Sequence, residues 1–354
     1  IFRAMVMFDM VRLWGDFPVI TTVADDITSE NIDEVYPQYF PKQNTELEAY
    51  QQIEKDLLDA VLYAPDNTPG NKTLFSKSVA RTLLAKIYAE KPLRDYTKVI
   101  QYCDEVKADG FDLVDDFSDL FGMNAAGTDA KMRNTKESIL EAQFTSGAGN
   151  WCTWIFGRDL VNWNNNFTWA KWVTPSRDLI SAFKQEGDEV RFKESIVYYD
   201  CNWSNYYPSD NYPFMYKCRS ANSSIIKYRY ADVLLLKAEA LIMQDTPDLE
   251  GAADIIDEVR DRAKLGALPT SVRSNKNAML NALLKERRLE LAFEGQRWFD
   301  LVRLDKVEEV MNAVYAKDSG RKAQIYTFDK NSYRLPIPQS VIDANDKIHQ
   351  NPGY

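Results

Sequence analysis

Three glutamates at helical spacing are the first residues that could carry chemistry. Glu286, Glu290 and Glu294 recur every four residues. The stretch that holds them, Lys285–Leu304, has no turn residue before Gly295, so we expect the three carboxylates to form one row on a helix. A glycoside hydrolase needs two carboxylates that face one glycosidic bond, which one helical row seldom provides. The pattern therefore favours a helix with a solvated ionic face, and a glycosidase is the alternative.

The same stretch contains charges next to large aromatic side chains. Glu294 and Arg297 lie between Phe293 and Trp298 in the sequence. We expect some of these charges to be partly buried and paired, because an unpaired buried charge is costly. Gly295 then permits a bend or a close helix contact before the apolar pattern restarts.

The histidine and cysteine content argues against most metal-dependent and histidine-dependent catalysis. The only histidine is His349, which excludes Ser-His-Asp triads and histidine-rich zinc sites. The four cysteines include no CxxC pair. Cys103 lies on an apolar helical face and is expected to be a core thiol, whereas Cys201 and Cys218 could bridge a loop. We predict no catalytic residue, no metal and no cofactor.

Length and composition set the class of the protein. The chain has 354 residues, 45% of them hydrophobic, which allows one large domain or two medium ones with a substantial core. The formal net charge of −10 argues against general nucleic-acid binding. No apolar run reaches the length that a membrane-spanning helix needs.

A segment rich in tryptophan and asparagine stands out from the rest. Residues 147–213 contain six of the eight tryptophans, interleaved with asparagines and followed by tyrosines. Flat aromatic rings stack on sugar rings, and short amides bind hydroxyls, so this mixture predicts a carbohydrate site. The alternative for each ring is burial in a core, which we expect for Trp172. The predicted ligand-binding residues are Trp151, Trp154, Trp163, Asn164, Asn166, Trp169, Trp203, Tyr206 and Tyr207.

Helical hairpins are expected on both sides of that segment. Ser78–Ala89 with Asp95–Lys107 predicts one pair, and Tyr230–Gln244 with Leu249–Ala263 predicts another. At an offset of 153 residues, small and apolar positions match between the two pairs, as when Ala85 matches Ala238. This pattern indicates degenerate tetratricopeptide-like units, with generic helical hairpins as the alternative. Further helices are expected at Ile1–Trp14 and Thr45–Ala60.

Four motifs together resemble one protein family. They are FRAMVMFDMVRLWGDFPVIT near the start, KYRYADVLLLKAEA from Lys227, KERRLELAFEGQRWFDLVRL from Lys285, and YRLPIPQ followed by IHQNPGY at the end. In this order they resemble the SusD/RagB family of outer-membrane nutrient-binding lipoproteins over nearly the whole chain. The departures are Trp14 where tyrosine is usual, Leu335 where an aromatic is frequent and Val341 where an acid is frequent.

The resemblance implies a mainly α SusD-like fold. Tetratricopeptide-like helical pairs would form its scaffold, beside an irregular, loop-rich ligand-binding region with minor β structure. We expect a single domain over residues 1–354, with scaffold at 1–110 and 225–310, the ligand region at 111–224 and a tail at 311–354. A family segment upstream of Ile1 is expected to be missing, and it could contribute part of the site.

The resemblance also implies a function. We expect non-catalytic binding of oligosaccharide or polysaccharide and its delivery to a SusC-like TonB-dependent outer-membrane transporter. The expected location is the outer membrane of a Gram-negative bacterium, as a surface-exposed lipoprotein whose N-terminal lipid anchor is absent from this chain. Three alternatives remain at this point, namely capture of peptides or another nutrient, a helical glycoside hydrolase, and a tetratricopeptide adaptor for protein partners.

Overall fold

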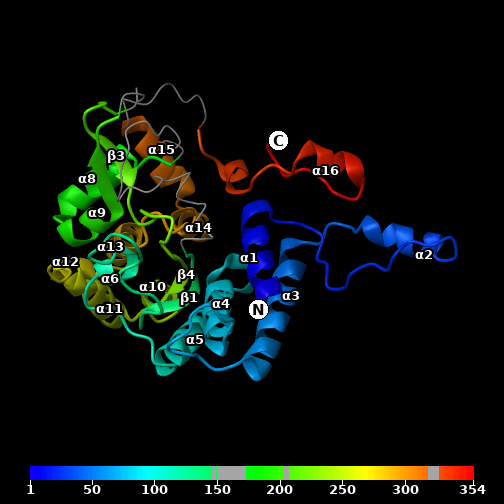
Figure 1. Ribbon diagram of the computed structural model, residues 1–354, viewed down its shortest axis with the longest axis horizontal. Coiled ribbons are helices and arrows are strands. Elements are labelled where there is room, and N and C mark those ends of the chain that lie inside the picture. The colour runs from blue at the N-terminus through cyan, green and yellow to red at the C-terminus, as the bar shows by residue number, and fades with distance from the viewer. Residues whose placement is uncertain (146–148, 150–172, 202–206, 318–326) are drawn as a thin grey trace.

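The computed structural model describes residues 1–145, 149, 173–201, 207–317 and 327–354, and these are mainly helical (Figure 1). The longer helices are α1 (Phe2–Trp14), α3 (Glu46–Tyr63), α4 (Lys77–Ala89), α5 (Tyr96–Ala108), α8 (Arg177–Glu186), α10 (Tyr230–Met243), α11 (Leu249–Arg262), α13 (Lys276–Glu290) and α15 (Val307–Lys317). The short ones are α2 (Ile32–Val35), α6 (Ser118–Phe121), α9 (Glu189–Ser195), α12 (Thr270–Arg273), α14 (Arg297–Arg303) and α16 (Gln339–Ala344), with 3₁₀ turns at Tyr36–Tyr39, Lys91–Leu93 and Lys330–Tyr333. The predicted fold class is confirmed.

Two helical hairpins form the centre of the scaffold, as the sequence predicts. α4 packs against α5, and α10 packs against α11. Ala85 on α4 and Ala238 on α10 are both fully buried, and their small side chains allow neighbouring helices to approach closely. The hairpins meet where Cys103 on α5 donates its thiol to the Val233 carbonyl of α10 at 3.5 Å. Cys103 is therefore the core thiol that its position on an apolar face predicts.

Helices α1 and α3 extend this core toward the N-terminus. α3 begins at a capping box in which Thr45 accepts from the Glu48 amide and Glu48 accepts from the Thr45 amide. The rings of Phe8 on α1 and Tyr50 on α3 meet edge to face at 6.2 Å, and both side chains are buried. α1 ends at Gly15, whose φ of 74° suits glycine.

Two small antiparallel sheets lie beside the helices. β1 (Ser138–Ala142) pairs with β4 (Ile225–Arg229), and β2 (Ile196–Tyr199) pairs with β3 (Tyr212–Met215). β4 leads directly into α10, since Arg229 ends the strand and Tyr230 begins the helix. The amide of Tyr230 donates to the Glu137 carbonyl just before β1. The end of β4 contacts the end of α13, where Arg229 donates to Glu290.

A sharp turn connects α13 to α14. α13 ends at Glu290, and the turn that follows contains Phe293 with a φ of 65° and Gly295 with a φ of 75°. The bend expected at Gly295 is present. A bulky side chain such as that of Phe293 rarely adopts positive φ, so the surrounding packing must hold this turn in place.

The expectation of a solvated ionic face on α13 is wrong. Glu286 and Glu290 are only 1% and 0% exposed. Helical periodicity identifies a polar face, but it does not show whether water or other charged side chains cover that face. Here arginines from distant parts of the chain cover it, as described below.

The C-terminal segment folds back on the start of the chain. The amide of Leu335 donates to the Leu13 carbonyl at 2.7 Å, and the side chain of Asn351 donates to the Trp14 carbonyl at 2.9 Å. The Gln350 side chain is bonded both to the amide and to the carbonyl of Ile337. The two terminal sequence motifs are thus in contact with each other and with the end of α1.

Candidate functional site

Most of the predicted ligand-binding residues lie outside the described part of the chain. These are Trp151, Trp154, Trp163, Asn164, Asn166, Trp169, Trp203 and Tyr206. Tyr207 is described. Its hydroxyl donates to the Pro175 carbonyl at 2.8 Å, and the Arg177 guanidinium lies 4.6 Å from its ring centroid. Tyr207, which precedes β3 in the sequence, is therefore in contact with the start of α8.

The β2–β3 hairpin carries a cluster of aromatic side chains next to Tyr207. Tyr212 meets the Tyr207 ring edge to face at 5.7 Å and the Phe214 ring at 4.9 Å. Tyr198 and Tyr199 on β2 are half-buried, and burial raises the pKa of both hydroxyls. Half-buried tyrosines present a ring face together with a hydrogen-bonding group, which is a combination that suits a sugar ligand.

The possible bridge between Cys201 and Cys218 does not form. Both residues are described and buried, and Cys201 is a free thiol. Cys201 belongs to the apolar cluster that Tyr212 and Phe214 form.

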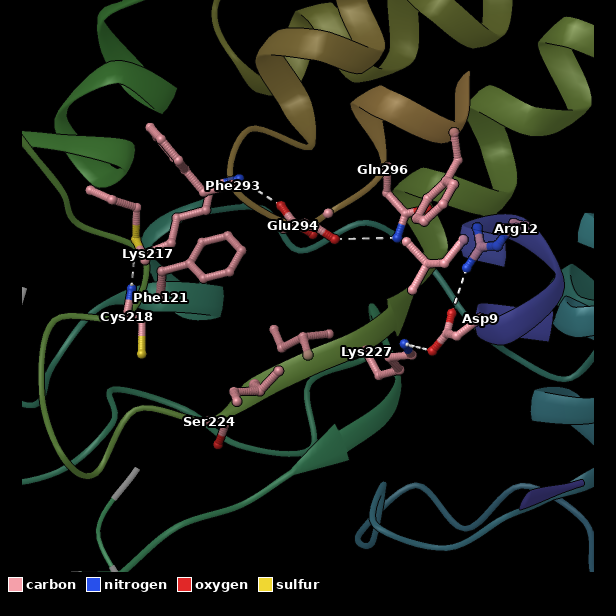
Figure 2. Close-up of a pocket in the computed structure, with 16 residues that line it drawn as sticks. Asp9, Arg12, Phe121, Lys217, Cys218, Ser224, Lys227, Phe293, Glu294 and Gln296 are labelled. Atoms are coloured by element: carbon pink, nitrogen blue, oxygen red, sulfur yellow. Dashed lines mark hydrogen bonds and ion pairs between the residues drawn. The ribbon is translucent and has the colours of Figure 1, made fainter. Parts of the chain in front are cut away.

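A cavity of about 430 Å³ lies between α1, β4 and the turn that follows α13 (Figure 2). Its volume is in the range of small-molecule sites. Its apolar walls include Leu13, Phe121, Met215, Ile225, Ile226, Phe293 and Phe299, and its polar residues include Asp9, Arg12, Lys217, Ser224, Lys227, Glu294 and Gln296. None of these residues was among those predicted to bind a ligand.

Asp9 lies between two cations at one end of the cavity. It accepts from Arg12 Nη2 at 2.6 Å and from Lys227 Nζ at 2.7 Å, as Figure 2 shows. Burial raises the pKa of Asp9, but the two cations outweigh it and hold the pKa below its ordinary value. The Arg12 guanidinium is itself 3.9 Å from the ring centroids of both Phe8 and Phe299, which fixes its position.

Glu294 lies between two other cations in the turn beside the cavity. It accepts from Lys217 Nζ at 2.6 Å and from Arg229 Nε at 2.7 Å, so the expected pairing of this carboxylate is confirmed. Burial lowers the pKa of Lys217 to about 8, although Glu294 opposes this shift. Arg297, by contrast, donates to the Leu284 carbonyl at 2.8 Å, and burial lowers its pKa to about 10.

Behind the cavity, Glu290 is the centre of a buried ionic network. It accepts from Arg229 at 2.5 Å, from Arg191 at 3.0 Å and also from Arg262. Burial raises the pKa of Glu290, but the three arginines outweigh burial and hold the pKa well below its ordinary value. A fully buried carboxylate with three guanidinium partners cannot reach a glycosidic bond, so Glu290 has a structural role.

An apolar groove of about 440 Å³ adjoins the same turn, and Phe293 and Gly295 line both this groove and the cavity. Trp298, Met311 and Val314 from α14 and α15 line the groove further along. Among the described residues no group of three or more histidine, cysteine or acidic side chains could hold a metal ion. No helix in the described ranges combines the length and apolar character that crossing a bilayer requires.

Sequence comparison matches two parts of the chain to known families. Residues 213–354 match the SusD family, and residues 1–89 match a family described as starch-binding and associating with the outer membrane. SusD-like protein P2 of Formosa agariphila is 28% identical over 401 residues, covering 99% of this chain and 72% of that protein. SusD-like protein P38 of the same organism is 42% identical over 99 residues, covering 26% of this chain and 19% of that protein.

Solved structures share the fold. A SusD-like protein from Bacteroides fragilis superposes with a TM-score of 0.76 at 22% identity, covering 99% of this chain and 78% of that chain. A laminarin-binding SusD-like protein superposes with a TM-score of 0.72 at 24% identity, covering 99% of this chain and 77% of that one.

The cavity could not be found from sequence spacing. Asp9 and Lys227 are 218 residues apart, and they meet only because the β1–β4 sheet is placed beside α1. The one local signal is the alternation of Lys227 and Arg229 on β4, since residues two apart in a strand point to the same face. Both side chains do bind carboxylates that line the cavity, namely Asp9 and Glu294.

Proposed function

Because the chain belongs to the SusD/RagB family, we propose that it binds oligosaccharides or polysaccharides without hydrolysing them. The observation that carries this proposal is the likeness, over 99% of the chain, to a solved structure of a laminarin-binding SusD-like protein. The match of residues 1–89 to a starch-binding family points to the same ligand class. A glycan array on the pure protein is the direct test, and binding of peptides but of no glycan would contradict the proposal.

The proposal includes a location and a partner. The protein works at the surface of the outer membrane of a Gram-negative bacterium as a lipoprotein, and it delivers its glycan to a SusC-like TonB-dependent transporter. Support comes from the family whose description includes association with the outer membrane. Copurification of such a transporter with the tagged protein from solubilised outer membranes tests this part, and recovery of the protein in another cell fraction would contradict it.

The proposed glycan platform consists of Trp163, Trp169 and Trp203, with Tyr206 and Tyr207. Trp151, Trp154, Asn164 and Asn166 complete the proposed contacts. The aromatic cluster on the β2–β3 hairpin supports it, because Trp203 and Tyr206 fall between β2 and β3 in the sequence. Stacking on a sugar buries a ring face without holding the scaffold together, so these rings are expected to contribute more to affinity than to stability.

Replacing Trp163, Trp169 or Trp203 singly with alanine should weaken glycan binding and spare stability. The expected loss is about 1–3 kcal/mol in binding free energy for each ring that stacks on sugar. Calorimetric titration with the glycan that the array identifies gives the affinity, and a melting curve gives the stability. Tyr36→Ala is a suitable control, because Tyr36 is half-exposed and lies on a different part of the chain. If all three variants melt early and their folded fraction binds normally, the platform lies elsewhere.

The protein should release no reducing ends from a glycan that it binds. In the described part of the chain, the helical glutamates are held by buried arginines, which leaves Glu290 inaccessible to substrate. A reducing-sugar assay beside retardation in a glycan-containing gel separates binding from turnover. Hydrolysis that disappears in a Glu290→Gln variant with an unchanged melting curve would show that the protein is an enzyme.

A further inference from the structure

The cavity between α1 and β4 has more positive than negative charge on its walls. Asp9 is paired with Arg12 and Lys227, and Glu294 is paired with Lys217 and Arg229. Arg229 does not line the cavity and also binds Glu137 and Glu290. The excess at the cavity is therefore that of three lining cations, Arg12, Lys217 and Lys227, over two lining carboxylates, in a chain whose net charge is −10. A ligand that brings one negative charge would be attracted to this excess.

Hydrogen-bond donors remain available at the Asp9 end of the cavity. Lys227 Nζ has three N–H groups and makes a single hydrogen bond within the described ranges, to Asp9. Arg12 uses Nε and Nη2, which leaves Nη1 without a hydrogen bond to any described residue. These N–H groups of Lys227 and Arg12 are available to an acceptor on a ligand.

The rest of the cavity is apolar. Leu13, Ile226 and Phe299 contribute side chains from three different elements. An apolar wall next to a cluster of donors suits a ring that has one carbon–hydrogen face and several polar substituents. A volume of about 430 Å³ has room for a sugar ring, and it is at the lower end of the range for ligand sites.

We propose that this cavity binds a sugar acid, namely a uronic acid residue, whose carboxylate pairs with Lys227 and whose ring lies against the apolar wall. The inference rests on the proposed function in that the ligand is a sugar, and it adds an acidic class and a second site to that function. Lys227 is the charge partner because its side chain is 37% exposed, whereas the Arg12 and Lys217 side chains are 7% and 4% exposed. An exposed ammonium with free N–H groups can accept a ligand without breaking the buried pairs.

The test compares glucuronate with glucose, which has the same ring without the charge. Both are titrated at matched ionic strength, with saturation-transfer NMR and calorimetry as readouts. Glucuronate should bind at least about tenfold more tightly than glucose, because a charge-assisted hydrogen bond is stronger than a neutral one. Added salt should reduce this preference. Equal affinity for the two sugars, or no binding of glucuronate, would overturn the proposal.

Variants locate the site. Lys227→Gln should remove the preference for glucuronate, and Lys227→Arg should retain most of it. Lys237→Gln is the matched control, because Lys237 also pairs with one aspartate but lies on the α5–α10 contact. A preference that persists in a folded Lys227→Gln variant would show that glucuronate binds elsewhere and would overturn the assignment. Tighter binding of a sulfated sugar than of glucuronate would overturn the carboxylate class.

A neutral-glycan measurement separates this inference from the proposed function. If the protein binds a neutral glycan but does not bind glucuronate, the cavity assignment is contradicted and the proposed function is not. Failure to retain any glycan, neutral or acidic, would contradict the proposed function as well.

Discussion

Replacing Glu290 with alanine should destabilise the protein by about 3–5 kcal/mol, the cost of removing one partner from a buried ionic pair. The glutamate is fully buried, and its removal leaves Arg191, Arg229 and Arg262 without their shared carboxylate. Buried guanidinium groups cannot be deprotonated to avoid this cost. A fall in Tm on the order of 5–10 °C is expected from a destabilisation of this size.

A matched control uses an exposed glutamate. Glu250 pairs with Arg273, and its side chain is 70% exposed. Glu250→Ala should therefore leave the melting temperature close to that of the wild type, because an exposed pair contributes little and Arg273 keeps Asp254 and Asp257 as partners. Thermal melting followed by circular dichroism, with denaturant unfolding beside it, compares the two variants. Coincident melting curves for Glu290→Ala and the wild type would mean that the network contributes nothing to stability.

Replacing Phe8 with alanine should also cost about 3–5 kcal/mol, in this case by leaving a cavity in the core. Phe8 is fully buried on α1 and packs edge to face against Tyr50. It also forms one side of the aromatic sandwich that holds Arg12 at the wall of the cavity. The variant should therefore be less stable than the wild type. Its folded fraction should also bind glucuronate more weakly, as the proposed role of the cavity requires.

The same helix supplies the control for Phe8. Phe2 is 62% exposed and touches only the edge of the Phe75 ring among described aromatic side chains. Phe2→Ala should leave the melting curve and the glucuronate affinity close to those of the wild type. Equal losses in the two variants would show that α1 responds to any truncation, and that Phe8 has no special role.

The helices could be predicted from the sequence because their signals are local. The pairs around Ala85 and Ala238 follow from apolar periodicity within about 30 residues, and their boundaries agree with the structure to within two residues. The environment of Glu290 could not be predicted in this way. Its partners Arg191, Arg229 and Arg262 come from three separate segments, and a charged residue in a sequence does not reveal what it will meet.

The two candidate sites also differ in whether local sequence patterns could predict them. Tyr207 was singled out by the local density of aromatic residues, and the structure places it in an aromatic hairpin cluster. The cavity depends on contacts between residues as distant as Asp9 and Lys227, for which no local pattern exists. Its polar residues look, in the sequence, like ordinary surface charges on a helix and a strand.

The hydrogen bonds that close the end of α1 affect the order of folding. The carbonyls of Arg12, Leu13 and Trp14 accept from Arg334, Leu335 and Asn351, and the last turn of a helix has no internal partners for such groups. During synthesis α1 emerges well before these donors, which follow more than 300 residues later. Contacts this distant in sequence are slow to form. Completion of α1 therefore has to wait for the last part of the chain, and a product cut short before Arg334 would expose a frayed helix end that proteases can attack.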